Sequence, residues 1–162
     1  MLAAGCIDDR QASQPLALVE RAVVRSVGDG DTLRLGDGRK VRLVQIDAPE
    51  LETDCYGRAA RRALLRLVPP GTRVTLERDS ALDAVDRYGR LLRYVVRDGR
   101  NTNLDLVSEG AAEPYFFHDE RGRLAGQLLR AAREARAEGR GLWSACPAAR
   151  LVPALGAVTG PA

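Results

Sequence analysis

The chain has almost no lysine or histidine and no paired cysteine motif, which excludes several kinds of site. Lys40 is the only lysine and His118 the only histidine among the 162 residues. The three cysteines, Cys6, Cys55 and Cys146, include no Cys-x-x-Cys pair. Zinc centres need several such ligands at short spacing, so the sequence argues against a structural or catalytic zinc site.

The sequence also lacks a long apolar run. No stretch approaches the ~18 consecutive apolar residues of a membrane-spanning helix. With 45% hydrophobic and 29% charged residues, the composition is that of one globular domain large enough to bury a core. The net charge of +3 comes from a basic side that is nearly all arginine. This charge is compatible with a polyanionic partner. A bias of the coding sequence toward arginine codons explains the arginine excess equally well.

The cysteines and the N-terminus bear on the compartment. A bond between Cys55 and Cys146 would close a long loop, as in exported proteins of an oxidising compartment; two separate buried thiols are the alternative. The segment from Met1 to Cys6 resembles the end of a lipoprotein signal, although Ala3 replaces the usual leucine. We therefore expect an exported protein, either secreted or lipid-anchored through Cys6 at the cell envelope.

Turn residues and apolar alternation predict a small barrel. Strands are expected at about 18–27, 32–35, 40–46, 74–76 and 91–96. Helices are expected at 57–67, from an N-cap at Asn103 to before Gly110, and at 121–138. Five strands with one helix after the third predict an α+β, mainly β fold: a five-stranded oligonucleotide-binding (OB-fold) barrel capped by about three helices.

The composition divides the chain into three segments. Residues 1–16 are read as a signal remnant and linker, and residues 17–146 as the folded domain. Residues 147–162 are rich in alanine, proline and glycine, so we expect a disordered tail. Nothing in the sequence indicates an obligate oligomer, and we expect a monomer.

Acidic residues stand at the ends of two neighbouring predicted strands. A hairpin joins these strands and brings Asp31 and Asp47 within reach of each other, where a bound cation would relieve their repulsion. Asp29 and Asp37 lie in glycine turns, and capping those turns is the simpler interpretation.

One arginine interrupts an apolar strand. Arg42 shares a face with Val44 and Ile46, whereas period 2 places Asp47 on the other face. For Arg42 and Asp47 to serve one site, the strand must bend or end before Asp47, and Ala48-Pro49 supplies such an ending. The guanidinium is either a solvated outward group or a bidentate donor for phosphate.

Five motifs occur in order along residues 18–145, and each alone is weak. They are Gly28-Asp29-Gly30-Asp31-Thr32, the segment Arg42 to Glu50, Tyr56-Gly57, Asp86-Arg87-Tyr88-Gly89-Arg90 and Leu142-Trp143-Ser144. Together they closely resemble the thermonuclease, or staphylococcal nuclease-like (SNase-like), family. The resemblance implies a calcium-dependent phosphodiesterase of micrococcal-nuclease type, an endonuclease acting on DNA and/or RNA, with residues 17–146 as the nuclease domain.

The resemblance also implies roles for individual residues. Asp31 and Asp47 correspond to the Ca²⁺ ligands, helped by the main-chain carbonyl of Ala48. Glu50 corresponds to the general base, and Arg42 and Arg90 to the catalytic arginines. The remaining positions are an outer-shell acid at Asp29 and substrate-phosphate contacts at Arg87 and Tyr88.

Two departures from the family and two alternative functions complete this interpretation. Ala48 replaces a threonine, and the base-stacking tyrosine segment aligns poorly with Tyr115-Phe116-Phe117. A non-catalytic OB-fold module that binds nucleic acid is the main alternative, but such relatives lose part of the acidic and arginine set. A hydrolase using His118 as base is the other, although this histidine lacks a partner motif.

Overall fold

A computed structural model describes residues 18–162. The predictions of a signal remnant and linker at 1–16 and of lipid attachment at Cys6 fall outside this range. Between residues 18 and 162, no helix is both long and apolar enough to cross a bilayer.

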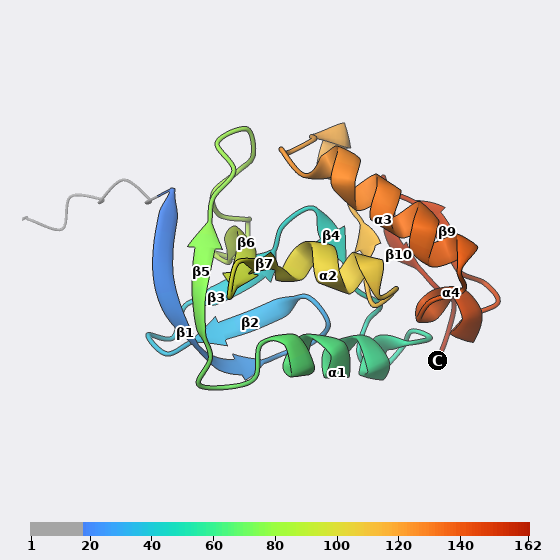
Figure 1. The fold of residues 1–162 in the computed structure, drawn as a ribbon, viewed down its shortest axis with the longest axis horizontal. Coiled ribbons are helices and arrows are strands. Elements are labelled where there is room, and N and C mark those ends of the chain that lie inside the picture. Colours follow the sequence, from blue (N-terminus) through green and yellow to red (C-terminus); the bar gives the residue numbers. More distant parts are fainter. Residues whose placement is uncertain (1–17) are drawn as a thin grey trace, which may run out of the picture.

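Five strands close into a barrel (Figure 1). They are β1 (Val19–Val27), β2 (Thr32–Leu35), β3 (Lys40–Leu43), β5 (Arg73–Glu77) and β6 (Leu91–Arg97). Strand β1 pairs with β2 and β5, β2 with β3, and β5 with β6, all antiparallel. The parallel pairing of β3 with β6 closes the ring. The predicted mainly β, OB-fold barrel is therefore confirmed.

Alternation along the strands fills the barrel interior. Leu33, Leu35, Val41 and Leu43 point inward and are at most 1% exposed. Burying one such side chain stabilises the fold by about 2 kcal/mol. The residues between them, including Arg42, face outward, so polar groups on β2 and β3 reach the outer surface without disturbing the core.

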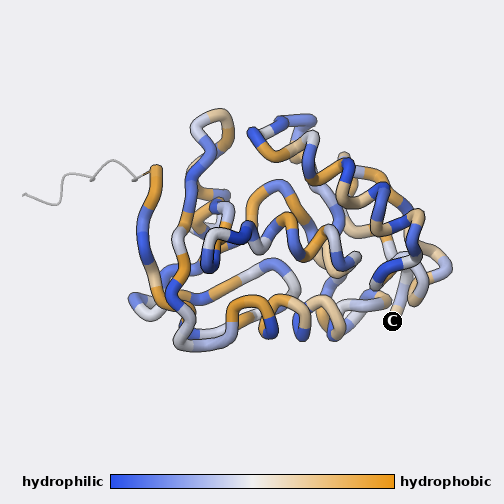
Figure 2. Tube along the Cα trace, in the orientation of Figure 1, coloured by the Kyte–Doolittle hydropathy of each residue, from blue (hydrophilic) through white to orange (hydrophobic). Residues whose placement is uncertain are grey.

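The helices lie along and beyond one side of the barrel (Figure 1). They are α1 (Gly57–Leu67), α2 (Thr102–Ser108), α3 (Ala125–Ala137), the short α4 (Leu142–Ala145) and the 3₁₀ turn η1 (Phe117–Asp119). Hydrophobic and hydrophilic residues alternate along α1 and α3 at helical spacing (Figure 2), and the hydrophobic ones pack inward. Helix α1 has the predicted bounds, whereas α3 begins at Ala125 rather than Arg121, because Gly122 and Arg123 donate their N–H groups to Gln45 and Asp79.

The predicted N-cap at Asn103 is wrong by two residues. Asn101 caps α2, and its Oδ1 accepts the Leu104 N–H at 3.0 Å. Asn103 lies fully buried inside the first turn, where it accepts the Val95 N–H and donates to the Val44 carbonyl. Its amide therefore ties α2 to β6 and to the end of β3.

The predicted strand 40–46 is broken in two. Strand β3 ends at Leu43, Gln45 adopts φ +64°, and β4 (Ile46–Asp47) pairs with β8 (Glu113–Pro114). The Gln45 side chain holds this bend by donating to the Glu120 carbonyl and accepting the Gly122 N–H. The bend comes three residues before Ala48-Pro49, and it turns Asp47 toward Arg42.

The prediction that residues 147–162 are disordered is wrong. They form the hairpin of β9 (Arg150–Val152) and β10 (Gly156–Val158). Elsewhere in the chain, the short strand β7 (Arg100–Asn101) pairs with β6. Backbone hydrogen bonds from Cys55 N–H to the Gly160 carbonyl and from Ala162 N–H to the Thr53 carbonyl fix the end of the chain. Composition missed this segment because tertiary partners, rather than its own apolar content, order it.

Candidate active site

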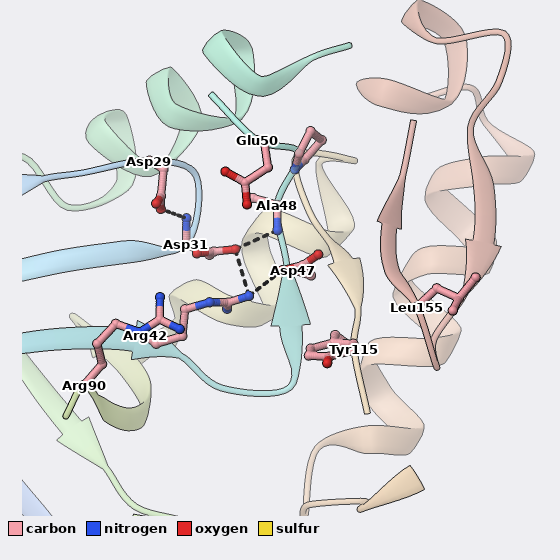
Figure 3. A pocket seen from close by; sticks show the side chains of 10 residues that line it. Asp29, Asp31, Arg42, Asp47, Ala48, Glu50, Arg90, Tyr115 and Leu155 are labelled. Atoms are coloured by element: carbon pink, nitrogen blue, oxygen red, sulfur yellow. Dashed lines mark hydrogen bonds and ion pairs between the residues drawn. The ribbon is translucent and has the colours of Figure 1, made fainter. Parts of the chain in front are cut away.

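The barrel, the bend and the tail meet at a pocket of about 260 Å³ (Figure 3). The residues around it are Asp29, Asp31, Arg42, Asp47, Ala48, Pro49, Glu50, Arg90, Tyr115 and Leu155. All of the residues predicted as catalytic, metal-ligating or outer-shell line this pocket. They come from the β1–β2 turn, β3, the segment after the bend and the turn before β6.

Asp31 lines the pocket and is only 5% exposed. One of its oxygens accepts the Ala48 N–H at 2.7 Å, and Asp29 accepts the Asp31 N–H at 3.0 Å. Burial raises the pKa of Asp31 to about 7, and Asp29 and Asp47 add to the rise while Arg42 opposes it. The carboxyl therefore sits where a further positive charge would favour its ionised form.

Arg42 is clamped between two carboxylates. Its Nη2 lies 3.1 Å from Asp31 and 2.5 Å from Asp47, and its Nη1 donates to the Leu43 and Ile46 carbonyls. The side chain is 12% exposed, so the solvated alternative is wrong. Burial alone would lower the pKa of Arg42, but Asp31 and Asp47 raise it overall.

Glu50 and Arg90 approach the pocket from two other directions (Figure 3). Glu50 is exposed, and its side chain lies beside Asp31 and Ala48. Arg90 donates from Nε to Asp86 at 2.6 Å, and Asp86 also accepts the Arg90 N–H at 3.0 Å. This link fixes the base of the Arg90 side chain and leaves its Nη groups directed at the pocket.

Arg87 and Tyr88 lie outside this pocket and line an adjoining groove of about 380 Å³. The groove shares Arg42, Arg90 and Tyr115 with the pocket. The Arg87 guanidinium donates to the Tyr88 hydroxyl at 2.6 Å and lies 4.8 Å from the centre of its ring. Tyr88 is 68% exposed, so this pair is open to a ligand that extends beyond the pocket.

His118 takes no part in the pocket. It is exposed, adopts φ +51°, and stacks on Phe117 with 3.9 Å between the ring centres. The alternative in which His118 acts as the base of a different hydrolase therefore has no geometric support.

Sequence reasoning missed three residues around the site. Tyr115 and Leu155 line the pocket, and Glu113 pairs with Asp47 across β4 and β8. The Glu113 carboxyl is fully buried, and within residues 18–162 no donor meets hydrogen-bond geometry with it. Burial raises its pKa to about 8, and the nearby Val158 N–H opposes this rise only in part. Neither Glu113 nor Leu155 is marked by a sequence signal, because long-range strand pairing and the fold of the tail bring them to the site.

The donor chemistry of the pocket suits a hard cation that keeps part of its hydration. Over residues 18–162, no group of three or more acidic, histidine or cysteine side chains converges as a ready-made metal cluster. Asp31 and Asp47 supply carboxylates on either side of one guanidinium, with the Ala48 backbone next to them. Calcium accepts such oxygen donors together with water.

Cys55 and Cys146 form a disulfide, with 5.9 Å between their Cα atoms. The bond joins the loop that follows Glu50 to the end of α4. It therefore fixes the segment between the pocket and α1 against the C-terminal part of the molecule.

Comparison with known proteins gives related sequences. SPbeta prophage-derived endonuclease YokF of Bacillus subtilis is 34% identical over 135 residues, which cover 78% of this chain and 45% of the relative. Protein ParB of Escherichia coli is 39% identical, covering 82% of this chain and 77% of ParB. An uncharacterized endonuclease of Escherichia coli is 43% identical, covering 75% of each. The chain thus spans less than half of YokF.

The family model described as staphylococcal nuclease homologue matches residues 40–145. This range begins with β3, which carries Arg42, and ends at α4, so it contains the bend, Glu50 and the Arg90 turn. The chain belongs to the staphylococcal nuclease homologue family.

Proposed function

We propose that this protein is a calcium-dependent nuclease that hydrolyses phosphodiester bonds of DNA and/or RNA. The observation that supports it most is the convergence of Asp31, Asp47, Glu50, Arg42 and Arg90 on one pocket. A phosphodiester hydrolase needs this combination of oxygen ligands, a base and cationic donors.

Nucleic acid is the substrate class that the comparisons favour. Two of the three related proteins above are named endonucleases, and the family is that of staphylococcal nuclease. Internal cleavage is therefore the proposed mode. The Arg87–Tyr88 pair in the adjoining groove offers a cation and an aromatic face for a neighbouring phosphate and nucleotide.

The proposed cation site consists of Asp31, Asp47 and the Ala48 carbonyl. Calcium bound there supplies Lewis-acid polarisation of the phosphate and a place for the attacking water. The protein holds its two carboxylates in position through the Ala48 N–H, the Ala157 N–H and Arg42.

Glu50 and the two arginines carry the proposed proton transfer and charge stabilisation. Glu50 is exposed at the pocket and takes a proton from water as general base. Arg42 and Arg90 donate to the non-bridging oxygens, where negative charge grows as phosphorus becomes five-coordinate. Asp86 holds Arg90 through Nε, which leaves the Arg90 Nη groups for the substrate. The Nη protons of Arg42 are accepted by Asp31, Asp47 and two carbonyls, so Arg42 exchanges one of these acceptors for a phosphate oxygen when calcium and substrate bind.

The test is a cleavage assay on single-stranded DNA, duplex DNA and RNA, with calcium and then with excess chelator. We expect cleavage that needs calcium and falls by about 10²–10⁴-fold in Glu50→Gln, the usual effect of removing a general base. Glu52→Gln, on the same loop but 67% exposed and paired with Arg58, is the matched control and should keep full activity.

Three outcomes would contradict the proposal in different ways. Binding without cleavage would favour the non-catalytic module, and chelator-resistant cleavage would remove calcium from the mechanism. Full activity of Glu50→Gln would remove the role given to Glu50.

We also propose that the protein works in an oxidising compartment outside the cytoplasm. The Cys55–Cys146 disulfide supports this location, because such bonds persist mainly in exported proteins. Thiol alkylation before and after reduction, on protein taken from the native cell, should find both cysteines protected until reductant is added.

A further inference from the structure

The C-terminal hairpin lies outside the family match yet reaches into the active-site pocket. The match ends at residue 145, whereas β9 and β10 cover 150–158. In Figure 3 the hairpin lies beyond β8, the strand that pairs with the Asp47 strand, and Leu155 lies in the turn of the hairpin. The pocket is therefore built partly from a segment that the family match does not include.

The hairpin holds one oxygen of Asp47. The Ala157 N–H donates to Asp47 Oδ2 at 2.9 Å, while Asp47 Oδ1 accepts from Arg42. The Asp47 side chain is 31% exposed, so few other contacts restrict its rotation. With one oxygen bound from each side, the carboxylate has a single orientation.

Gly156 permits this contact. A Cβ at this position would lie 2.4 Å from Asp47 Oδ2, and the residue has φ +80°. Any side chain here would push the Asp47 carboxylate away from its position. The hairpin can approach so closely only because residue 156 is glycine.

Leu155 places an apolar side chain at the edge of the pocket. It is 69% exposed and lines the pocket together with polar residues and Tyr115. In Figure 3 it enters on the side away from Arg90. An exposed leucine beside a phosphate-sized polar pocket suits the sugar or base next to the scissile phosphate.

Several bonds keep the tail in register with the loop after Glu50. Phe116 N–H donates to the Pro153 carbonyl and Cys55 N–H to the Gly160 carbonyl, and the disulfide at Cys55 anchors the start of the tail. The tail is thus attached both to the Glu50 loop and to the segment after β8, the strand that pairs with the strand of Asp47.

We propose that the hairpin completes the active site: Ala157 and Gly156 orient Asp47 for cation binding, and Leu155 contacts the nucleotide next to the cleaved bond. This inference rests on the proposed calcium-dependent nuclease function. Ala157 and Gly156 are positioning residues, since they act through Asp47.

The test compares Gly156→Ala with Gly160→Ala in the full chain. Gly160 has φ +78° in the same tail, and its added Cβ would meet Ala148 rather than Asp47, so it controls for backbone strain. Ala157→Pro is a second variant, because it removes the N–H that Asp47 accepts. Calcium affinity is measured by titration calorimetry without substrate, and melting temperature is measured in chelator.

We expect Gly156→Ala and Ala157→Pro to weaken calcium binding on the order of 10-fold or more relative to Gly160→Ala, the usual effect of losing a group that orients a metal ligand. Leu155→Ala should raise KM for an oligonucleotide more than it raises KM for a small chromogenic phosphodiester, which has no neighbouring nucleotide to contact. Equal calcium affinity in the two glycine variants would overturn the positioning role while leaving the nuclease intact. A wild-type protein that neither binds calcium nor cleaves would overturn the proposed function as well.

Discussion

Arg42 illustrates how a charged residue is accommodated within an apolar strand. Its guanidinium faces outward from the barrel but is covered by the bend after Leu43, where two carbonyls and two carboxylates accept its protons. The geometry requires a planar donor that can reach four acceptors, which lysine cannot supply.

Arg42→Lys should therefore lower cleavage by about 10²–10³-fold, as expected when a charge-stabilising donor is lost. Arg34→Lys is the control, because Arg34 is exposed on the neighbouring strand β2. Steady-state rates on one oligonucleotide at saturating calcium provide the measurement. Equal rates for the two variants would show that a single positive charge at position 42 is enough.

Glu113 should make the folded state sensitive to pH. Burial raises its pKa from 4.5 to about 8, so between these values the folded protein holds a proton that the unfolded chain releases. Stability should therefore fall as pH rises through this window, by up to about 1.4 kcal/mol per pH unit for one proton. Below pH 4.5 the group is neutral in both states and has no effect.

Glu113→Gln should remove this part of the pH dependence, so the variant should be more stable than wild type at pH 8 and nearly equal to it at pH 5. Urea unfolding in chelator at both pH values measures the difference. Glu134→Gln, on the exposed side of α3, should leave the wild-type dependence in place. An unchanged slope in Glu113→Gln would mean that the carboxyl ionises in the fold.

At the scale of elements, the two asparagines near α2 have different roles. Asn101 caps the helix, whereas Asn103 bonds the helix to β6 and to the end of β3. Asn101→Ala should cost about 1 kcal/mol, because it removes one N-cap hydrogen bond at an accessible helix end. Asn103→Ala should cost about 2–3 kcal/mol, because it leaves the buried Val95 N–H and Val44 carbonyl unpaired. Chemical denaturation of both variants tests the order, and a larger loss at Asn101 would contradict it.

Local pattern predicted the elements that are ordered by their own residues. The alternation of Leu33 and Leu35, the glycine turns and the apolar face of α1 fixed those elements within a residue or two. The sequence predicted that the strand bends or ends before Asp47, but it placed this ending at Ala48-Pro49. The position at Gln45 was out of reach because its positive φ is held by Glu120 and Gly122, which lie far along the chain. The start of α3 was out of reach for the same reason, because Gln45 and Asp79, far back along the chain, accept the N–H groups of Gly122 and Arg123.

The site residues were predicted through family resemblance, while the contacts among them came from the fold. The sequence suggested that Asp31 and Asp47 meet, but it could not show that Arg42 joins them. The Asp47 contact to Ala157 spans 110 residues and no motif marks it. Long-range backbone hydrogen bonds leave no periodic signal in a sequence.

For the molecule as a whole, the disulfide is the main covalent constraint. Cys55 and Cys146 are 91 residues apart, and a loop of this size restricts the unfolded chain enough to stabilise the fold by about 4 kcal/mol. The double variant Cys55→Ser/Cys146→Ser should unfold at lower urea concentration, and reductant should have no further effect on it. Equal midpoints for the oxidised wild type and the double variant would contradict this.

The parallel pairing of β3 with β6 closes the barrel, and Arg42 and Arg90 lie on either side of this pairing. Arg42 is paired there with Leu92, two residues beyond Arg90. No shorter piece of the barrel brings these guanidinium groups together. A chain that has just been synthesised or exported, and in which β3 has not yet paired with β6, would contain every active-site residue and yet have no active site.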